Sequence, residues 1–118
     1  MPAQALDPAR LVGSWVFTVD NGQGGFPIEV DIGEGLSTLT VGRIGRSEGD
    51  GVTGAVLRGN TLQIDTRMRG WCRRGSAATL EVRFRDDGRF RRGEWSGTCR
   101  RQAVGTMPVA SGEKVGGR

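Results

Sequence analysis

The sequence predicts an all-β protein, and three observations support this prediction. Short runs of alternating apolar and polar residues recur along the chain, glycine-rich turns separate them, and no stretch has the spacing of a long amphipathic helix. The 118 residues include 21 glycines and only four prolines, a balance that fits frequent tight turns rather than a disordered or collagen-like chain. A chain of this length forms one domain with a single modest core.

The first elements are a helical turn and a strand. Residues 7–11 are expected to form the turn, because Asp7 can cap it and Pro8 suits its first position. A strand is predicted over residues 13–20. The clearest alternation in the chain follows over residues 26–32, where four apolar side chains share one face and two acids share the other.

Six further strands are predicted after residue 35. Residues 45–51 are expected to form a polar loop, Gly59-Asn60 a two-residue hairpin and Asp86-Asp87-Gly88 another turn. The strands are predicted over residues 36–44, 52–58, 61–68, 77–85, 90–97, and from 98 or 99 to 104 or 107.

Eight short strands at this spacing predict a single eight-stranded antiparallel up-and-down β-barrel over residues 1–107. Residues 108–118 have no periodicity and are predicted to form a flexible tail. A β-sandwich is the alternative, because alternation alone does not distinguish a closed sheet from two stacked sheets. Eight strands enclose just enough space for side chains or for one small ligand.

The N-terminal residues Ala5-Leu6-Asp7-Pro8-Ala9-Arg10-Leu11-Val12-Gly13-Ser14-Trp15 resemble the opening of the lipocalins, in which a helical turn leads to Gly-x-Trp on the first strand. The short chain is similar to smaller calycins, the avidin-like and bacterial lipocalin-like barrels. The resemblance implies that Trp15, after Gly13, closes one end of the barrel. It also implies that an arginine from the last strand, Arg100 or Arg101, packs across the indole, a contact worth about 0.5–2 kcal/mol.

The chain also departs from these families. The tryptophan-rich strands that hold biotin in avidins are missing, as is the proximal histidine of the haem-binding nitrobindin-like barrels. The resemblance therefore implies a barrel rather than a particular ligand, and no cofactor is predicted.

The composition excludes several kinds of chemistry. The chain has no histidine, no tyrosine and two cysteines, so the usual zinc and haem ligand sets cannot be assembled within it. Ser-His-Asp and Cys-His nucleophiles are excluded for the same reason. No catalytic motif is recognised, and no metal site is predicted.

Positive charge is concentrated in the second half of the chain. Residues 1–64 hold four arginines and seven acids, whereas residues 65–101 hold eleven arginines and five acids. Such arginines could meet nucleic acid, phosphates or an acidic protein. Alternation instead favours a solvated outer face, partly neutralised by Glu81, Asp86, Asp87 and Glu94, so nucleic-acid binding is the weaker interpretation. The arginines of this face are Arg83, Arg85, Arg89, Arg91 and Arg92.

The two cysteines have a specific interpretation. If residues 86–88 form the hairpin tip, residues 75 and 76 lie opposite Cys99, and Cys72 lies within reach of it. A disulfide would stabilise the fold by about 3–4 kcal/mol; two buried free thiols are the alternative. A bridged protein belongs in an oxidising compartment. The N-terminus lacks the apolar segment of a signal peptide, which indicates either a cytoplasmic protein or a mature form. No apolar run is long enough for a membrane span.

The predicted function is binding of one small, largely apolar molecule inside the barrel. Trp95 shares its strand face with Gly93 and Gly97, so its ring either lines a cavity or covers those glycines. One alternative is an enzyme of the cyclase or isomerase type that uses a desolvated Asp or Glu, although the clearest strands direct their acids outward. Another is a protein-binding or inhibitor module whose arginine-rich face docks an acidic partner. The predicted ligand-lining residues are Phe17, Ile28, Ile64, Trp71, Val82, Phe84 and Trp95.

Overall fold

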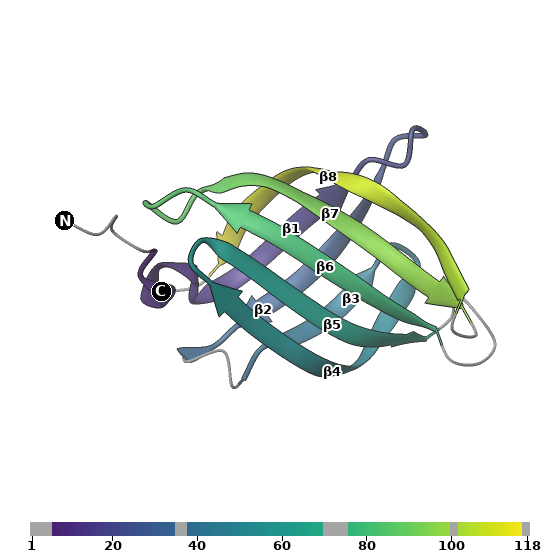
Figure 1. Ribbon diagram of the computed structural model, residues 1–118, viewed down its shortest axis with the longest axis horizontal. Coiled ribbons are helices and arrows are strands. Elements are labelled where there is room, and N and C mark those ends of the chain that lie inside the picture. The colour runs from purple at the N-terminus through teal and green to yellow at the C-terminus, as the bar shows by residue number, and fades with distance from the viewer. Residues whose placement is uncertain (1–5, 35–37, 70–75, 100–101, 117–118) are drawn as a thin grey trace.

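The protein is a closed antiparallel β-barrel in which the eight strands follow one another in sequence order (Figure 1). The computed structural model describes residues 6–34, 38–69, 76–99 and 102–116, with the backbone alone for 102–104. The predicted up-and-down barrel is confirmed, and the β-sandwich alternative is excluded. The elements are the 3₁₀-helix η1 (Pro8–Leu11) and strands β1 (Gly13–Val19), β2 (Phe26–Ile32), β3 (Thr40–Ile44), β4 (Ser47–Arg58), β5 (Thr61–Arg69), β6 (Ala77–Phe84), β7 (Phe90–Cys99) and β8 (Gln102–Gly116).

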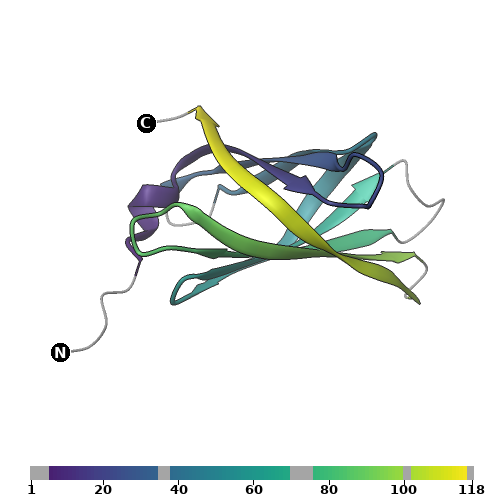
Figure 2. The ribbon, with the colours of Figure 1, turned by 90° about the horizontal axis from the view of Figure 1, so that it is seen from above.

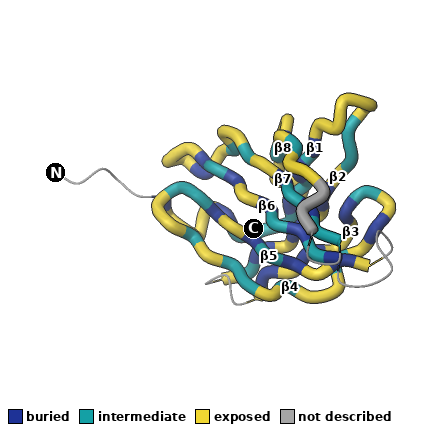
Figure 3. The backbone as a smooth tube through the Cα atoms, turned by 45° about the vertical axis from the view of Figure 1, so that its right-hand side comes forward, coloured by how far each residue is buried: buried dark blue, intermediate teal, exposed yellow. Residues whose placement is uncertain are grey.

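The core fills the interior of the barrel. Along β1, β2, β5 and β6, buried residues alternate with more exposed ones, so that each strand contributes one apolar face (Figure 3). This period of two is what a sheet with one buried face requires. The side chains with less than 2% exposure are Leu11, Phe17, Val19, Ile28, Val30, Leu62, Ile64, Val82 and Phe84.

One end of the barrel is closed by η1, which forms where the sequence predicts a helical turn. Asp7 caps it by accepting a hydrogen bond from the Ala9 backbone N–H at 3.0 Å. Leu11 is fully buried, and the indole Nε1 of Trp15 donates to its carbonyl at 2.9 Å. Gly13, between them, has a φ of 141°, which favours glycine. These contacts fix η1 against the start of β1.

Strand β4 begins earlier than the sequence predicts. Residues 47–51, expected in a polar loop, form its first part, with register shifts against β5 between Gly49 and Gly54. Bulges of this kind interrupt the alternation from which a strand is recognised. The preceding strand, β3, is shorter than predicted, and begins at Thr40.

The predicted flexible tail does not hold for residues 108–116, which form the second half of β8. Residues up to Val109 pair with β7, and those from Val109 onward pair with β1, so β8 crosses from one strand to the other (Figure 2). Val109 itself is buried and pairs with Gly93 on β7 and with Val19 on β1. The sequence hides this strand because small and charged residues follow Val109 rather than alternating apolar ones.

An aromatic cluster packs beside the second half of β8. The rings of Trp15 and Phe17 are stacked with centroids 5.6 Å apart, and Phe84 lies edge-on to Trp15 at 5.3 Å. Phe90 lies 6.2 Å from Phe17. Gly112 pairs with Phe17 across the sheet, and a Cβ there would lie 2.7 Å from Phe17 Cδ1 and 2.8 Å from Phe90 Cδ1. Both rings therefore depend on glycine at this position.

We expect Gly112→Ala to lower the free energy of unfolding by about 1–3 kcal/mol, because the added methyl group overpacks the two rings. Gly42→Ala is the matched control, since the nearest atom to its Cβ, the Glu29 carbonyl oxygen, lies 3.9 Å away. That control should change stability by no more than about 0.5 kcal/mol. Urea-induced unfolding measures both variants, and equal effects would contradict the role of Gly112.

Candidate functional site

We call the end of the barrel opposite η1 the open end, because no described element covers it as η1 covers the other end. A cavity of about 520 Å³ lies there, between the β1–β2 loop, the β3–β4 turn, the end of β5 and the middle of β7. We call it the mouth cavity. Its apolar wall consists of Phe26, Ile44, Met68 and Trp95, and its charged lining residues are Arg43 and Arg46.

The floor of the mouth cavity is a contact between two aromatic rings. Trp95 and Phe26 meet edge to face with their centroids 5.4 Å apart. Phe26 begins β2 and Trp95 lies on β7, and β8 and β1 separate these strands in the barrel. The contact therefore crosses the interior, with Trp95 in the core cluster and the partly buried Phe26 packed against it. Such edge-to-face pairs contribute about 0.5–1.5 kcal/mol beyond their buried area.

The β3–β4 turn is held close to this floor. Gly45 donates its backbone N–H to the Pro27 carbonyl oxygen at 2.7 Å, which ties the turn to the start of β2. Ile44, immediately before the turn, is 4% exposed and pairs with Ile28 on β2. One wall of the cavity is thus fixed by backbone pairing.

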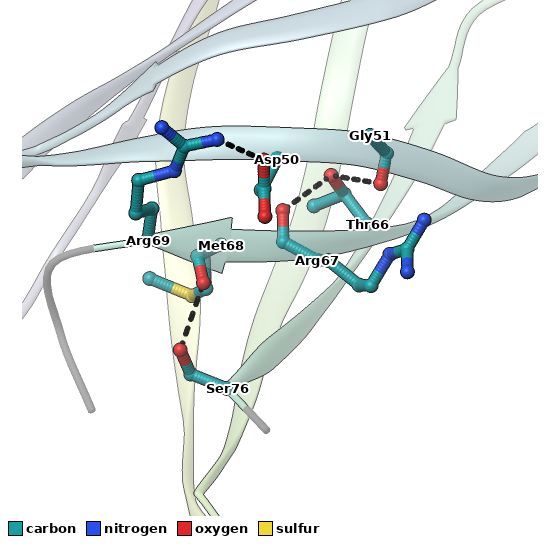
Figure 4. A network of polar contacts seen from close by, with 7 residues as sticks. All are labelled: Asp50, Gly51, Thr66, Arg67, Met68, Arg69 and Ser76. Carbon is teal, nitrogen blue, oxygen red and sulfur yellow. Dashed lines mark hydrogen bonds and ion pairs between the residues drawn. The ribbon is translucent and has the colours of Figure 1, made fainter. Parts of the chain in front are cut away.

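Polar contacts around Met68, on β5 next to β4, fix the adjoining wall (Figure 4). Ser76 exchanges two hydrogen bonds with Met68: its hydroxyl donates to the Met68 carbonyl at 2.9 Å, and its own carbonyl accepts from the Met68 N–H at 3.2 Å. The Thr66 hydroxyl lies 3.2 Å from the Gly51 carbonyl and can donate to it where the β4 bulge interrupts pairing. Arg69 and Asp50 form an exposed ion pair beyond it, which raises the pKa of Arg69. The two hydrogen bonds to Ser76 therefore fix the backbone of Met68 where its side chain lines the cavity.

The structure separates the predicted ligand-lining residues. Phe17, Ile28, Ile64 and Val82 are at most 1% exposed and belong to the core beneath the floor. Phe84 also belongs to this core, and its edge borders a surface cavity of about 420 Å³ beside Asn60. Trp95 lines the mouth cavity. Trp71 lies outside the described residues.

Sequence reasoning missed most of the mouth residues. Phe26, Ile44 and Met68 are the terminal apolar residues of their strands on the side of the open end. Once the barrel and the position of η1 are assumed, strand direction could have indicated all three. The two arginines carry no comparable signal, because their spacing along the chain is that of an ordinary polar turn.

The predicted packing of a last-strand arginine across Trp15 stays a prediction. Arg100 and Arg101, predicted to pack across the indole, lie outside the described residues. The register of β1 and β8 places Lys114 opposite Trp15, and the Lys114 ammonium donates to the Arg10 carbonyl of η1 at 3.2 Å. In the described part of the chain, the last-strand cation beside Trp15 is therefore Lys114.

A larger groove, of about 930 Å³, lies at the closed end. It runs between η1, the β6–β7 turn and the second half of β8, where β8 has left β7 beyond the Gly93–Val109 pair. Its lining includes the ion pair of Arg89 and Asp87, with Nε and Oδ2 2.8 Å apart. Trp15 and Phe90 also line this groove, but seven of its fourteen lining residues are charged, against two of eleven in the mouth cavity, so it suits an apolar ligand less well.

The outer arginine face is less neutralised than the sequence predicts. Arg83 and Arg92 stand directly opposite each other on β6 and β7, and so do Glu81 and Glu94. Of the predicted neutralising contacts, the described residues show the pair between Arg89 and Asp87. Like charges in direct opposition are destabilising within a sheet. On this outer face the arginine pair lies next to the glutamate pair, so the charge of the face does not favour an acidic partner.

The remaining features define no further chemistry. Within the described ranges, no three His, Cys, Asp or Glu side chains are grouped so that they could hold a metal ion. The described helical segment is too short to cross a membrane. Cys99 ends β7, whereas Cys72 lies outside the described residues, so their pairing stays a prediction.

Fold and site thus define a small closed barrel with η1 at one end and, among the described residues, a cavity with an apolar wall at the other. Searches for matching protein families, curated proteins and solved structures found no match. The resemblance to calycins therefore rests on the barrel, the η1 turn and the Gly-x-Trp residues alone.

Asp87 offers a test of the charged groove. Its carboxylate accepts from the Arg89 backbone N–H at 3.0 Å and from Arg89 Nε at 2.8 Å, and these bonds lower the pKa of Asp87 below 3.8. Because the folded-state pKa is depressed, the stabilisation is present above the unfolded-state value and is lost as the pH falls below about 4. We expect Arg89→Gln to raise the pKa only part of the way, since the backbone bond remains.

The measurement is a carboxyl ¹³C NMR titration of Asp87. Arg91→Gln is the matched control and should leave the titration unchanged, because the charge it removes is not among those that depress this pKa. An Asp87 pKa that is the same in Arg89→Gln as in the wild type would contradict the assignment.

Proposed function

We propose that the protein binds one small, largely apolar molecule in the mouth cavity, above the Trp95–Phe26 floor. The observation that carries the proposal is a cavity of about 520 Å³ whose apolar lining is Phe26, Ile44, Met68 and Trp95. Trp95, Ile44 and Met68 are 4–6% exposed and Phe26 is only partly buried, so binding would remove water mainly from Phe26.

The size and lining of the cavity support this function. Small-molecule sites are concave, mostly apolar and of about 300–1,000 Å³, with a few polar groups that orient the ligand. The mouth cavity, of about 520 Å³, falls in this range. Its walls are fixed by strand pairing and by the Ser76–Met68 bonds, so little ordering is required when a ligand enters.

The packed core limits where the ligand can lie. The predicted interior residues Phe17, Ile28, Ile64 and Val82 are already buried against one another. Inserting a ligand among them would require opening a core that is closely packed. The proposed carrier therefore differs from a deep calycin-type cup, and holds its ligand near the rim.

The two alternative functions gain no specific support. The buried polar residues of the described chain are Ser47, Thr66 and Ser76, so the described interior offers no carboxylate for a cyclase or isomerase. The arginine face has acids in the adjacent row, so charge complementarity to an acidic protein is incomplete.

We expect Trp95→Leu to weaken binding of 1-decanol, a neutral apolar probe, about tenfold, because the lost ring contact is worth about 1.4 kcal/mol. Phe90→Leu, at the closed end, is the matched control and should leave the affinity unchanged. Binding is followed through the methyl ¹³C signal of Met68 in NMR titrations, and urea unfolding checks that both variants are folded.

The wild-type protein gives an independent reading if Trp95→Leu does not fold. The probe should shift the Met68 methyl and Trp95 indole signals and leave the Trp15 indole signal in place, because Trp15 lies at the other end. Shifts confined to Trp15 would move the site to the closed end and overturn the proposal.

We also propose the bridge between Cys72 and Cys99, with export as its consequence. Cys99 is the last residue of β7, at the open end of the barrel, and a bridge from it would tie the β5–β6 connection to β7. We expect the intact mass of unreduced protein from its host to be about 2 Da below that after reduction, because each disulfide releases two hydrogens. Equal masses would indicate free thiols and favour a reducing compartment.

A further inference from the structure

Among the described residues, the charges that line the mouth cavity have one sign. Its charged residues are Arg43 and Arg46, and no described carboxylate lines it. Both arginines are exposed. Neither forms an ion pair with a described residue, although Arg43 stands opposite Glu48 in the β3–β4 register. Two guanidinium groups at this rim are therefore available to a ligand.

The arginines and the aromatic surface lie on different sides of the mouth. Arg43 belongs to β3, and Arg46 to the turn that follows it, whereas Trp95 belongs to β7. These two strands are four positions apart in an eight-stranded barrel, which places them across from each other. A ligand that spans the cavity would meet cations at one side and the Trp95 ring at the other.

We propose that the ligand is an anionic amphiphile, a monocarboxylate with an apolar body, whose carboxylate faces Arg43 and Arg46. This inference rests on the proposed function and names its ligand class. A guanidinium presents N–H donors in a planar fork that matches a carboxylate, and such charge-assisted bonds are stronger than neutral ones. The apolar body would lie against the apolar lining of the cavity, of which Phe26 is only partly buried and can release water.

The exposure of the two arginines sets the expected size of the effect. Ion pairs in contact with solvent are weak and are screened by salt. The floor therefore supplies most of the affinity, and the arginines supply preference for the anion. We expect the preference for an anion over a neutral analogue to be about three- to tenfold at low salt.

The experiment compares decanoate with 1-decanol, which share a ten-carbon chain and differ in charge. Both are titrated against the wild type, Arg43→Gln/Arg46→Gln and Arg83→Gln/Arg92→Gln, and followed by the Met68 methyl signal. Decanoate should bind the wild type more tightly, and the mouth variant should lose this preference while its affinity for 1-decanol is unchanged. The second double variant removes the same charge from the outer face and should retain the preference. Raising the salt to about 0.5 M should reduce the preference.

The outcomes separate this inference from the proposed function. The anion assignment is overturned if 1-decanol binds and decanoate binds no more tightly than it. The assignment is also overturned if Arg43→Gln/Arg46→Gln still binds decanoate more tightly than 1-decanol. In both cases the apolar site stands. A preference lost only in Arg83→Gln/Arg92→Gln overturns the assignment in favour of the outer face. If neither compound perturbs Met68 or Trp95, the proposed function itself fails.

Discussion

Closure of the sheet depends on β8, which pairs with β7 along its first half and with β1 along its second. Val109 is the residue at which the two ladders meet, and its buried side chain anchors the crossing. An open sheet would expose two edges with unpaired backbone groups. The oblique path of β8 satisfies both edges with one strand, and it also causes the groove at the closed end, where β8 and β7 separate.

The two ends of the barrel follow from how the aromatic side chains are distributed. At the η1 end, Trp15, Phe17, Phe84 and Phe90 pack together, and Gly112 leaves the room that two of these rings occupy. At the other end, one aromatic contact, between Phe26 and Trp95, spans the interior, and no described element covers it as η1 covers the first cluster. The same eight strands thus form one core that η1 covers at one end and that ends at the Phe26–Trp95 contact at the other.

Alternation within single strands is enough to predict the barrel. The candidate site, in contrast, is formed by contacts between strands that lie far apart in the sequence. Alternation was sufficient for β2, β5 and β6, and the Asp7-Pro8 signal was sufficient for η1. The sequence does not indicate the second half of β8, because glycine is required at position 112 by the rings of Phe17 and Phe90. Both rings are distant from Gly112 in the sequence. Trp95 was identified as a candidate, but its partner Phe26 was not, since β2 and β7 are not neighbours in the sheet.

An apolar floor with cations at one rim restricts the ligand more than an apolar cup would. A deep cavity selects mainly for volume, because burial of apolar area has no direction. A ligand in the proposed site would meet the apolar lining beside Trp95 and Phe26, and Arg43 and Arg46 line the same cavity. A molecule with one polar end can satisfy both regions at once, whereas a wholly apolar one would leave the arginines hydrated and its own far end in water. Shape and charge at this mouth therefore favour ligands that remain partly exposed and bind and leave without opening of the core.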